Sequence, residues 1–296
     1  MTIDLCKSAK CTRISVYYVP AYELKGANHL YDFIKTDIDN KIFHLILDRT
    51  DERNAVNLPM VQEIGRAVDE AEKAFNNGDA RVLIVRAEGR AFSQGIDLNT
   101  LNDYVELYGE QWRDNLFATT RTLQDVLTKL ERSSLPTICV IHGYCIGTGF
   151  EIALACDFRI VAERTRISLP ETRLGIIPDV GGTVRLVNLI GASRAKEAIL
   201  TGRTIDLNQA EQWGMINYIV PKNELMNKAN ELAEELKLAA PMAVNYGKRV
   251  INDIVDNQRG LNVEAWAQAA LFRSEDFEAG VEAMRTKSYP VEWKGK

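Results

Sequence analysis

Hydrophobic and polar positions along the first two-thirds of the chain change repeatedly between the period of a strand and that of a helix. Residues 33–49 predict two strands joined by a turn at Asp39-Asn40, and both faces of the second strand are apolar. Short β-branched runs predict further buried strands, and apolar residues at helical spacing predict helices between them. These strands are expected at 81–87, 137–143 and 158–163, and the helices at 60–75, 101–132 and 151–157. The order predicts an α/β fold with parallel, right-handed units.

From about Asn188 onward the pattern is helical almost throughout. One stripe of apolar residues at helical spacing, typical of a face packed on a core or on a partner, consists of Leu225, Ala229, Leu232 and Leu236. A second apolar group, near the chain end, consists of Ala265, Trp266, Ala269, Ala270 and Phe272. We therefore predict an N-terminal arm at 1–30, an α/β core at 31–220 and a helical C-terminal region at 221–296.

Composition limits the function classes that fit the chain. Of its 296 residues, 46% are hydrophobic and 26% are charged, as in ordinary globular domains, and the formal net charge of −5 argues against a general nucleic-acid-coating protein. No apolar run reaches the roughly 18 residues that would span a bilayer, and charges occupy the N-terminus, where a secretory signal needs an apolar stretch. Five cysteines without CxxC spacing are typical of reduced thiols. A soluble, cytoplasmic protein is expected.

Metal and hydrolase chemistry fit the sequence poorly. The histidines are too scattered for a zinc site of recognisable spacing, and the GxSxG turn of serine hydrolases is absent. Two glycine-containing segments, 90–98 and 142–157, instead follow predicted strands. In the second segment the glycines leave backbone N–H groups free at a helix start, which is a natural anion site; a tight packing joint is the alternative reading. Because no phosphate-loop Lys-Ser/Thr pair follows, the anion need not be a phosphate, and a developing oxyanion suits this site.

Two glutamates add acid–base chemistry to this part of the chain. Glu151 lies in the first predicted helical turn beside the glycines, where capping of its own helix is an alternative role. Glu171 follows twenty residues later, between Pro170 and Gly175. Two carboxylates that flank one substrate carbon can share general acid and general base work, provided that the fold brings them together.

Four segments in this order resemble the enoyl-CoA hydratase/isomerase (crotonase) superfamily. They are RAFSQGIDL, HGYCIGTGFEIALACDFRIVAE, LPETRLGIIPDVGGTVRL and AKEAILTGRTIDLNQAEQWGMINYIV, and the similarity runs from about Phe33 to Trp293. The resemblance implies a fold of repeated ββα units that form two roughly perpendicular sheets, followed by a helical C-terminal region that packs trimers. It also implies that acyl-CoA thioesters bind with the thioester oxygen between two backbone N–H groups, which stabilise an enolate-like intermediate.

The resemblance assigns roles to individual positions of this sequence. The two N–H donors of the oxyanion hole fall on Ile96 and on Thr148, where most relatives have glycine, and the two hydratase glutamates fall on Glu151 and Glu171. Both glutamates together favour the addition of water to a 2-enoyl-CoA. The other implied substrate contacts are Arg90, Gln94, Gly95, Asp97, Gly147 and Lys287, whereas Asn99 stands where hydratases often have lysine. No metal and no resident cofactor is expected, and coenzyme A enters as part of the acyl-CoA substrate.

Asp179 leaves the reaction open. Dienoyl-CoA isomerases and 3-hydroxyisobutyryl-CoA hydrolases are similar to this chain in placing aspartate there, so the alternative is a Δ3,5-Δ2,4-dienoyl-CoA isomerisation in which Glu171 and Asp179 move the proton. Those isomerases usually carry aspartate at the position of Glu151, and Asp179 has the alternative role of capping the helix that begins near Val180. A third reading is a non-catalytic, crotonase-like binding protein. The resemblance also implies a homotrimer or homohexamer; neither nucleic acid nor a membrane is expected as a partner.

Overall fold

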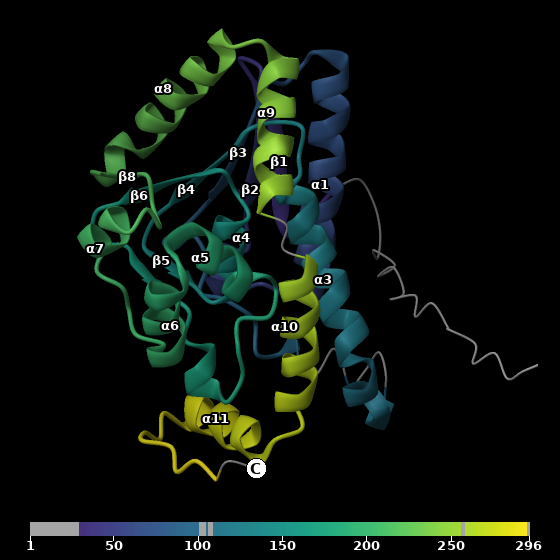
Figure 1. Cartoon of the computed structure of the whole chain (residues 1–296), viewed down its shortest axis with the longest axis vertical. Helices are drawn as coiled ribbons and strands as arrows, with labels where there is room; N and C mark the ends of the chain where they lie inside the picture. The colour runs from purple at the N-terminus through teal and green to yellow at the C-terminus, as the bar shows by residue number, and fades with distance from the viewer. Residues whose placement is uncertain (1–29, 101–104, 106–108, 256–257, 295–296) are drawn as a thin grey trace, which may run out of the picture.

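A computed structural model of the protein describes residues 30–100, 105, 109–255 and 258–294, so the predicted arm lies outside the described residues except for Leu30. A six-stranded sheet with the order β1-β2-β3-β4-β6-β8 forms its centre (Figure 1). Its first pair is antiparallel and all other neighbours are parallel. The strands are β1 (Ile34–Asp39), β2 (Ile42–Leu47), β3 (Val82–Ala87), β4 (Thr137–Ile141), β6 (Phe158–Ala162) and β8 (Tyr218–Val220). The expected α/β class with parallel units is confirmed.

The first two strands form the predicted hairpin, but its turn comes one residue later than expected. Asn40 and Lys41 both have positive φ, at 47° and 60°, which is the combination that a tight two-residue hairpin turn needs. Asp39 instead ends β1 in register with Ile42. The turn therefore consists of Asn40 and Lys41.

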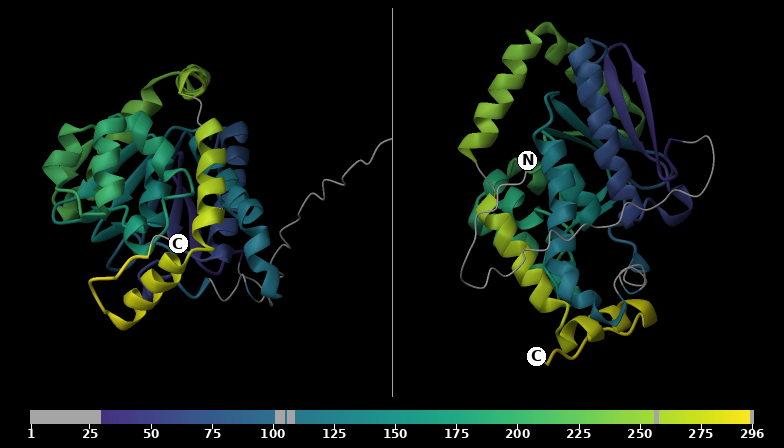
Figure 2. Two further views of the ribbon diagram at one scale, coloured as in Figure 1. Left: turned by 60° about the horizontal axis from the view of Figure 1, so that its bottom comes forward. Right: turned by 90° about the vertical axis from the view of Figure 1, so that its right-hand side faces the viewer.

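Helices cover both faces of the sheet (Figure 2). On one face, α1 (Leu58–Asn77) packs on β1 and β2, and α3 (Leu116–Glu131) packs on α1. On the other face lies α8 (Leu225–Leu238), which contacts β3, β4 and β6. The predicted stripe on α8 is buried against these strands, with Leu236 partly buried beside Leu225, Ala229 and Leu232. Because both faces are covered, β3 is apolar except for Arg86, and β4 is apolar after Thr137.

The helix boundaries follow local capping chemistry. The helix predicted at 60–75 starts earlier, at Leu58, because the Asn57 side chain accepts a hydrogen bond of 2.9 Å from Met60 N. The single helix predicted at 101–132 is wrong: residues 109–115 form the 3-10 helix η2 (Gly109–Asn115), and the α-helix begins only at Leu116. Most of the remaining predicted span, 101–108, lies outside the described residues.

Further elements complete the core and the C-terminal region. Two three-residue strands that the hydrophobic pattern did not predict, β5 (Tyr144–Ile146) and β7 (Arg166–Ser168), form a second, parallel sheet. The helix predicted at 151–157 starts three residues earlier, as α4 (Thr148–Leu154). The remaining helices are η1 (Thr50–Glu52), η3 (Glu171–Leu174), α5 (Gly182–Ile190), α6 (Ala192–Thr201), α7 (Leu207–Gln212), η4 (Lys222–Glu224), α9 (Pro241–Ile254), α10 (Gln258–Leu271) and α11 (Glu275–Thr286). Among the described helices, none is both long enough and apolar enough to cross a membrane.

Candidate active site

Two segments that follow neighbouring strands of the main sheet, β3 and β4, lie against each other. Phe92 N donates to His142 O at 2.8 Å, and Ser93 N donates to Tyr144 O at 2.9 Å. Ile146 N donates back to Ser93 O at 3.1 Å. These bonds fix the two glycine-containing segments beside each other, as a site built from both requires.

The backbone around Ile96 leaves one N–H group free to face the site. Val56 N donates to Gly95 O, and Asp97 N donates to Val56 O, both at 2.8 Å. Because successive N–H groups in an extended segment point to opposite sides, the N–H of Ile96 points away from Val56. Within the described ranges, no atom accepts a hydrogen bond from it. An ion pair of 2.7 Å between Asp97 and Arg49, both largely buried, holds this segment in place.

A second free N–H group lies at the start of α4. Gly147 precedes this helix with a φ of 53°, and its carbonyl accepts hydrogen bonds from Phe150 N at 2.7 Å and from Glu151 N at 3.0 Å. Thr148 is the first helical residue, so its N–H has no carbonyl one turn earlier, and no described residue accepts from it. A Cβ at Gly147 would lie 2.7 Å from Glu171 Oε1, so glycine is needed both for its φ and for the approach of this carboxylate.

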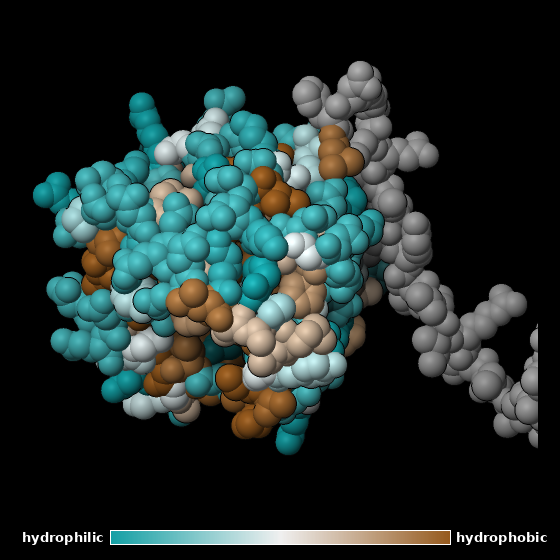
Figure 3. All heavy atoms as spheres, turned by 90° about the horizontal axis from the view of Figure 1, so that it is seen from above, coloured by the Kyte–Doolittle hydropathy of each residue, from teal (hydrophilic) through white to brown (hydrophobic). Residues whose placement is uncertain are grey.

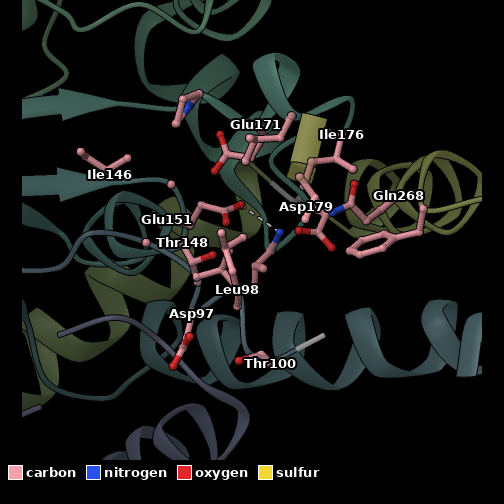
Figure 4. Close-up of a pocket in the computed structure, with 18 of the residues that line it drawn as sticks. Asp97, Leu98, Thr100, Ile146, Thr148, Glu151, Glu171, Ile176, Asp179 and Gln268 are labelled. Atoms are coloured by element: carbon pink, nitrogen blue, oxygen red, sulfur yellow. Dashed lines mark hydrogen bonds between the residues drawn. The ribbon is translucent and has the colours of Figure 1, made fainter. Parts of the chain in front are cut away.

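Both free amides line one pocket together with the carboxylates of Glu151, Glu171 and Asp179 (Figure 4), and the pocket with its open mouth contains about 970 Å³ of empty space. The carboxylates of Glu151, Glu171 and Asp179 thus meet as the resemblance implied. Part of the apolar wall comes from α3, from Phe272 just after α10, and from α11, which the sequence did not place at the site. These wall residues are Leu116, Leu123, Phe272, Phe277, Val281 and Met284.

The remaining expected contacts divide into two groups. Those that line the pocket are Gln94, Gly95, Asp97 and Gly147. Arg90 and Lys287 are exposed and lie outside the pocket lining, so the structure does not bring them together with the carboxylates. In the part of the chain that the structure describes, no three His, Cys, Asp or Glu side chains are grouped to hold a metal ion.

Glu151 is buried, and its carboxylate caps a helix other than its own. Its Oε1 accepts hydrogen bonds of 2.9 Å from Val180 N and from Gly182 N, at the start of α5. The expected alternative, capping of its own helix, is therefore wrong. Burial raises the pKa of Glu151 to about 7, although the two amides and the Arg185 guanidinium lower it. The carboxylate can thus accept a proton near neutral pH.

Glu171 is buried as well, but its carboxyl group has fewer hydrogen-bond partners than that of Glu151. Its Oε2 is buried and has no hydrogen-bond partner among the described residues. Burial, followed by the negative charges of Glu151 and Asp179, raises the pKa of Glu171 well above its ordinary value. The side chains of Glu171 and Glu151 enter the pocket from different elements, η3 and α4 (Figure 4). Burial and the neighbouring negative charges thus favour the protonated form of Glu171, which is the form that can donate a proton.

Asp179 faces the pocket and does not cap α5. Thr120 Oγ1 donates to Asp179 Oδ2 at 3.1 Å, and the Gln268 side chain donates to the same carboxylate. Burial, followed by repulsion from Glu151, raises the pKa of Asp179 to about 8. The capping role is wrong because amides at the start of α5 donate to glutamates instead. Neither Thr120 nor Gln268 was predicted, since no local pattern links residues so distant in the sequence.

Known proteins resemble this chain over most of its length. The family model described as enoyl-CoA hydratase/isomerase matches residues 37–296. An enoyl-CoA isomerase/hydratase of Mycosarcoma maydis is 33% identical over 258 residues, which cover 84% of this chain and 92% of that protein. A mitochondrial Delta(3,5)-Delta(2,4)-dienoyl-CoA isomerase of Dictyostelium discoideum is 29% identical over 270 residues, covering 88% and 91%. The crystal structure of an enoyl-CoA hydratase/isomerase from Xanthobacter autotrophicus Py2 matches with a TM-score of 0.77 at 28% identity, covering 86% of this chain and 94% of that one.

Proposed function

Because the chain belongs to the enoyl-CoA hydratase/isomerase family, we propose that it is an enoyl-CoA hydratase, which adds water across the 2,3 double bond of an enoyl-CoA thioester. The observation that carries this proposal is the pairing of two buried glutamates in different environments beside two free amides. The names of the relatives include both a hydratase and a dienoyl-CoA isomerase, so the choice between the two reactions rests on the site.

In the proposed mechanism the thioester oxygen accepts hydrogen bonds from the N–H groups of Ile96 and Thr148. These stabilise the negative charge that develops on that oxygen when water adds to C3. Ionised Glu151 accepts a proton from the attacking water, and protonated Glu171 donates a proton to C2 as the enolate collapses. The C2–C3 π bond is lost while C3–O and C2–H bonds form. The pKa order of the two glutamates supports this division of roles.

Asp179 supports a second candidate, a Δ3,5-Δ2,4-dienoyl-CoA isomerase. This carboxylate lines the same pocket and raises the pKa of Glu171 by repulsion, so the two groups are near enough to share one substrate. In that reaction one of them removes a proton from the conjugated chain and the other returns one. Thr120 and Gln268 already engage the Asp179 carboxylate, whereas Glu171 Oε2 has no partner among the described residues. We favour hydration because Glu151 and Glu171, the two glutamates that this reaction requires, line the pocket together.

Turnover by the wild-type protein tests the proposal. The protein is incubated with crotonyl-CoA and, separately, with a 3,5-dienoyl-CoA. Hydration removes the enoyl absorbance, and isomerisation creates the absorbance of the conjugated 2,4-diene. We expect rapid loss of the enoyl absorbance. Diene formation without hydration would assign the isomerase reaction, and binding without turnover of either compound would assign the non-catalytic role.

Coenzyme A takes part in this proposal only as the carrier of the acyl group. The apolar wall formed by α3, Phe272 and α11 suits an acyl chain, and the protein's own carboxylates and amides supply the acid, the base and the charge stabilisation. Arg90 and Lys287 remain the proposed contacts of the nucleotide part, since their exposed positions lie outside the acyl pocket.

An exposed apolar face on α9 supports the proposed self-association. Side chains on this helix that are at least half exposed recur at helical spacing: Met242, Tyr246, Val250, Ile251 and Ile254. The view onto the end of the molecule where α8 and α9 meet shows apolar side chains gathered in patches on a largely polar surface (Figure 3). In the second predicted apolar group, Ala265, Ala269 and Phe272 are buried within the chain, whereas Trp266 is exposed.

We expect a trimer or a hexamer, because closed symmetry would cover such a face on every 33.3 kDa chain and give about 100 or about 200 kDa. Light scattering coupled to gel filtration, over two decades of protein concentration, measures this mass. Val250→Arg is expected to lower it, and Glu211→Arg, at an exposed position on α7, serves as the control. A monomer that is stable at every concentration and active on an enoyl-CoA would contradict the prediction.

A further inference from the structure

The turn whose amides bind Glu151 is itself bound by a second glutamate, Glu264, which lies outside the pocket. Gly181 N donates to Glu264 Oε2 at 2.8 Å, and Val184 N donates to Glu264 Oε1 at 2.7 Å. The amides on either side of Gly181 donate to Glu151. Two carboxylates from different helices thus share the N–H groups at the start of α5. Glu264 is 3% exposed and does not line the pocket, so it cannot contact a substrate there.

Glu264 lies on α10, a helix that contacts both α3 and α5 (Figure 1). One turn before it, the carbonyl of Leu261 accepts a hydrogen bond of 2.9 Å from Gln124 Nε2 of α3. One turn after it, Gln268 Oε1 accepts a hydrogen bond of 3.3 Å from Ile177 N. Helix α10 therefore bonds the segment at 177–184 at two successive turns, through Glu264 and Gln268, and bonds α3 one turn earlier.

We propose that Glu264 is a positioning residue for the hydration reaction, because it holds the turn at 180–184 so that two amides of this turn orient the carboxylate of Glu151. Gly181 lies in this turn with a φ of 94°, a conformation that glycine both adopts and leaves readily. Without Glu264, two buried amides would lack an acceptor, and the turn would have to move to regain one. This inference rests on the proposed function.

The effect on Glu151 has a defined sign. The charged and titratable groups that face Glu151 are Arg185 from α5, Glu171 from η3, Asp179 from the loop before α5, and Glu264 from α10. Burial, followed by repulsion from Glu151, raises the pKa of Glu264 to about 8, so this group is mostly protonated where Glu151 titrates. Its removal therefore takes away little charge. Loss of the amide hydrogen bonds to Glu151 dominates and raises the pKa of Glu151 further.

The test compares Glu264→Ala and Glu264→Gln with a packing control, Leu261→Ala. Leu261 is buried on the same helix, and its side chain lies beside Gly181. A leucine side chain cannot accept a hydrogen bond from the amides of the turn. For Glu264→Ala we expect kcat to fall at least tenfold with KM within twofold. The acid limb of kcat/KM should move up by about half a pH unit or more, since the base is ionised only at higher pH. Glu264→Gln keeps one carbonyl oxygen that can accept a hydrogen bond from the turn, so it should shift the acid limb of kcat/KM less than Glu264→Ala does.

Leu261→Ala should lower stability and leave the acid limb in place. An unmoved limb in Glu264→Ala, or an equal displacement in Leu261→Ala, would overturn the proposal.

A second measurement needs no turnover, so it separates failure of this inference from failure of the proposed function. Urea unfolding is followed for the wild type, Glu264→Ala, Glu151→Gln and the double variant at one protein concentration. Each variant changes the equilibrium constant for unfolding by some factor relative to the wild type. If both carboxylates act on one turn, the factor for the double variant should differ at least fivefold from the product of the factors for the two single variants. Additive effects would overturn the inference even in an active hydratase. A clear coupling in a protein that hydrates no enoyl-CoA would keep the contact and reject the reaction.

Discussion

Replacing Glu151 with glutamine is expected to slow the hydration of crotonyl-CoA by about two to four orders of magnitude, the range typical of losing one general base. Glutamine keeps an oxygen that can accept from the Val180 and Gly182 amides, so the turn before α5 should stay in place. What it loses is the ability to take a proton from water. Glu171→Gln should cost a similar factor, because an amide cannot supply the acidic proton to C2. Steady-state rates from the loss of enoyl absorbance measure both effects.

Binding of a 3-hydroxyacyl-CoA product should change little in either variant, since the oxyanion donors and the apolar wall are untouched. Glu211→Gln, an exposed carboxylate on α7, is the matched control and should retain the wild-type rate. Near-wild-type hydration by Glu151→Gln would exclude Glu151 as the base of the proposed mechanism. Near-wild-type rates in Glu171→Gln would rule out both candidate reactions.

Substituting Thr148 with proline is expected to reduce the hydration rate by about 10² to 10³, the usual cost of removing one oxyanion-hole donor. The structure makes this substitution unusually clean. Thr148 is the first residue of α4, a position at which proline is favoured, and its N–H donates to no acceptor within the described residues. Proline therefore removes the donor without breaking a hydrogen bond of the fold.

Thr148→Ala is the matched variant, because it removes the side chain and keeps the N–H. It should stay within a few-fold of the wild type, and circular dichroism should show that both variants are folded. A folded proline variant with full activity would exclude this amide from the oxyanion hole. An alanine variant as slow as the proline variant would assign the effect to the threonine side chain instead.

The core of the fold could be predicted from the sequence because its strands are buried on both faces. The runs 82–85 and 138–141 are continuously apolar, and the helix that follows Asn57 carries both a capping residue and a regular apolar face. The strands β5, β7 and β8 have three residues each, which is too short to show a period. The helix predicted at 101–132 failed because apolar spacing alone does not reveal a 3-10 segment.

At the site, the backbone features were predictable and the side-chain directions were not. Glycines next to strand ends indicated free amides, and the structure leaves such an amide at Ile96 and at Thr148. Glu151 lies in the first turn of its own helix, yet its carboxylate reaches amides about thirty residues further along the chain. Asp179 follows a proline in a typical capping position, yet Thr120 and Gln268 hold its side chain in the pocket. Tertiary packing decides both directions.

The most direct test of the central claim, that two amides and two glutamates act on one thioester, is a crystal structure of the Glu151→Gln variant with crotonyl-CoA bound. We predict that the thioester oxygen lies about 2.7–3.2 Å from the nitrogens of both Ile96 and Thr148, as hydrogen bonds require. C2 should face the carboxyl group of Glu171, and C3 should face the side chain at position 151. A thioester oxygen bound away from these two amides, or an acyl group with C2 directed away from Glu171, would contradict the account.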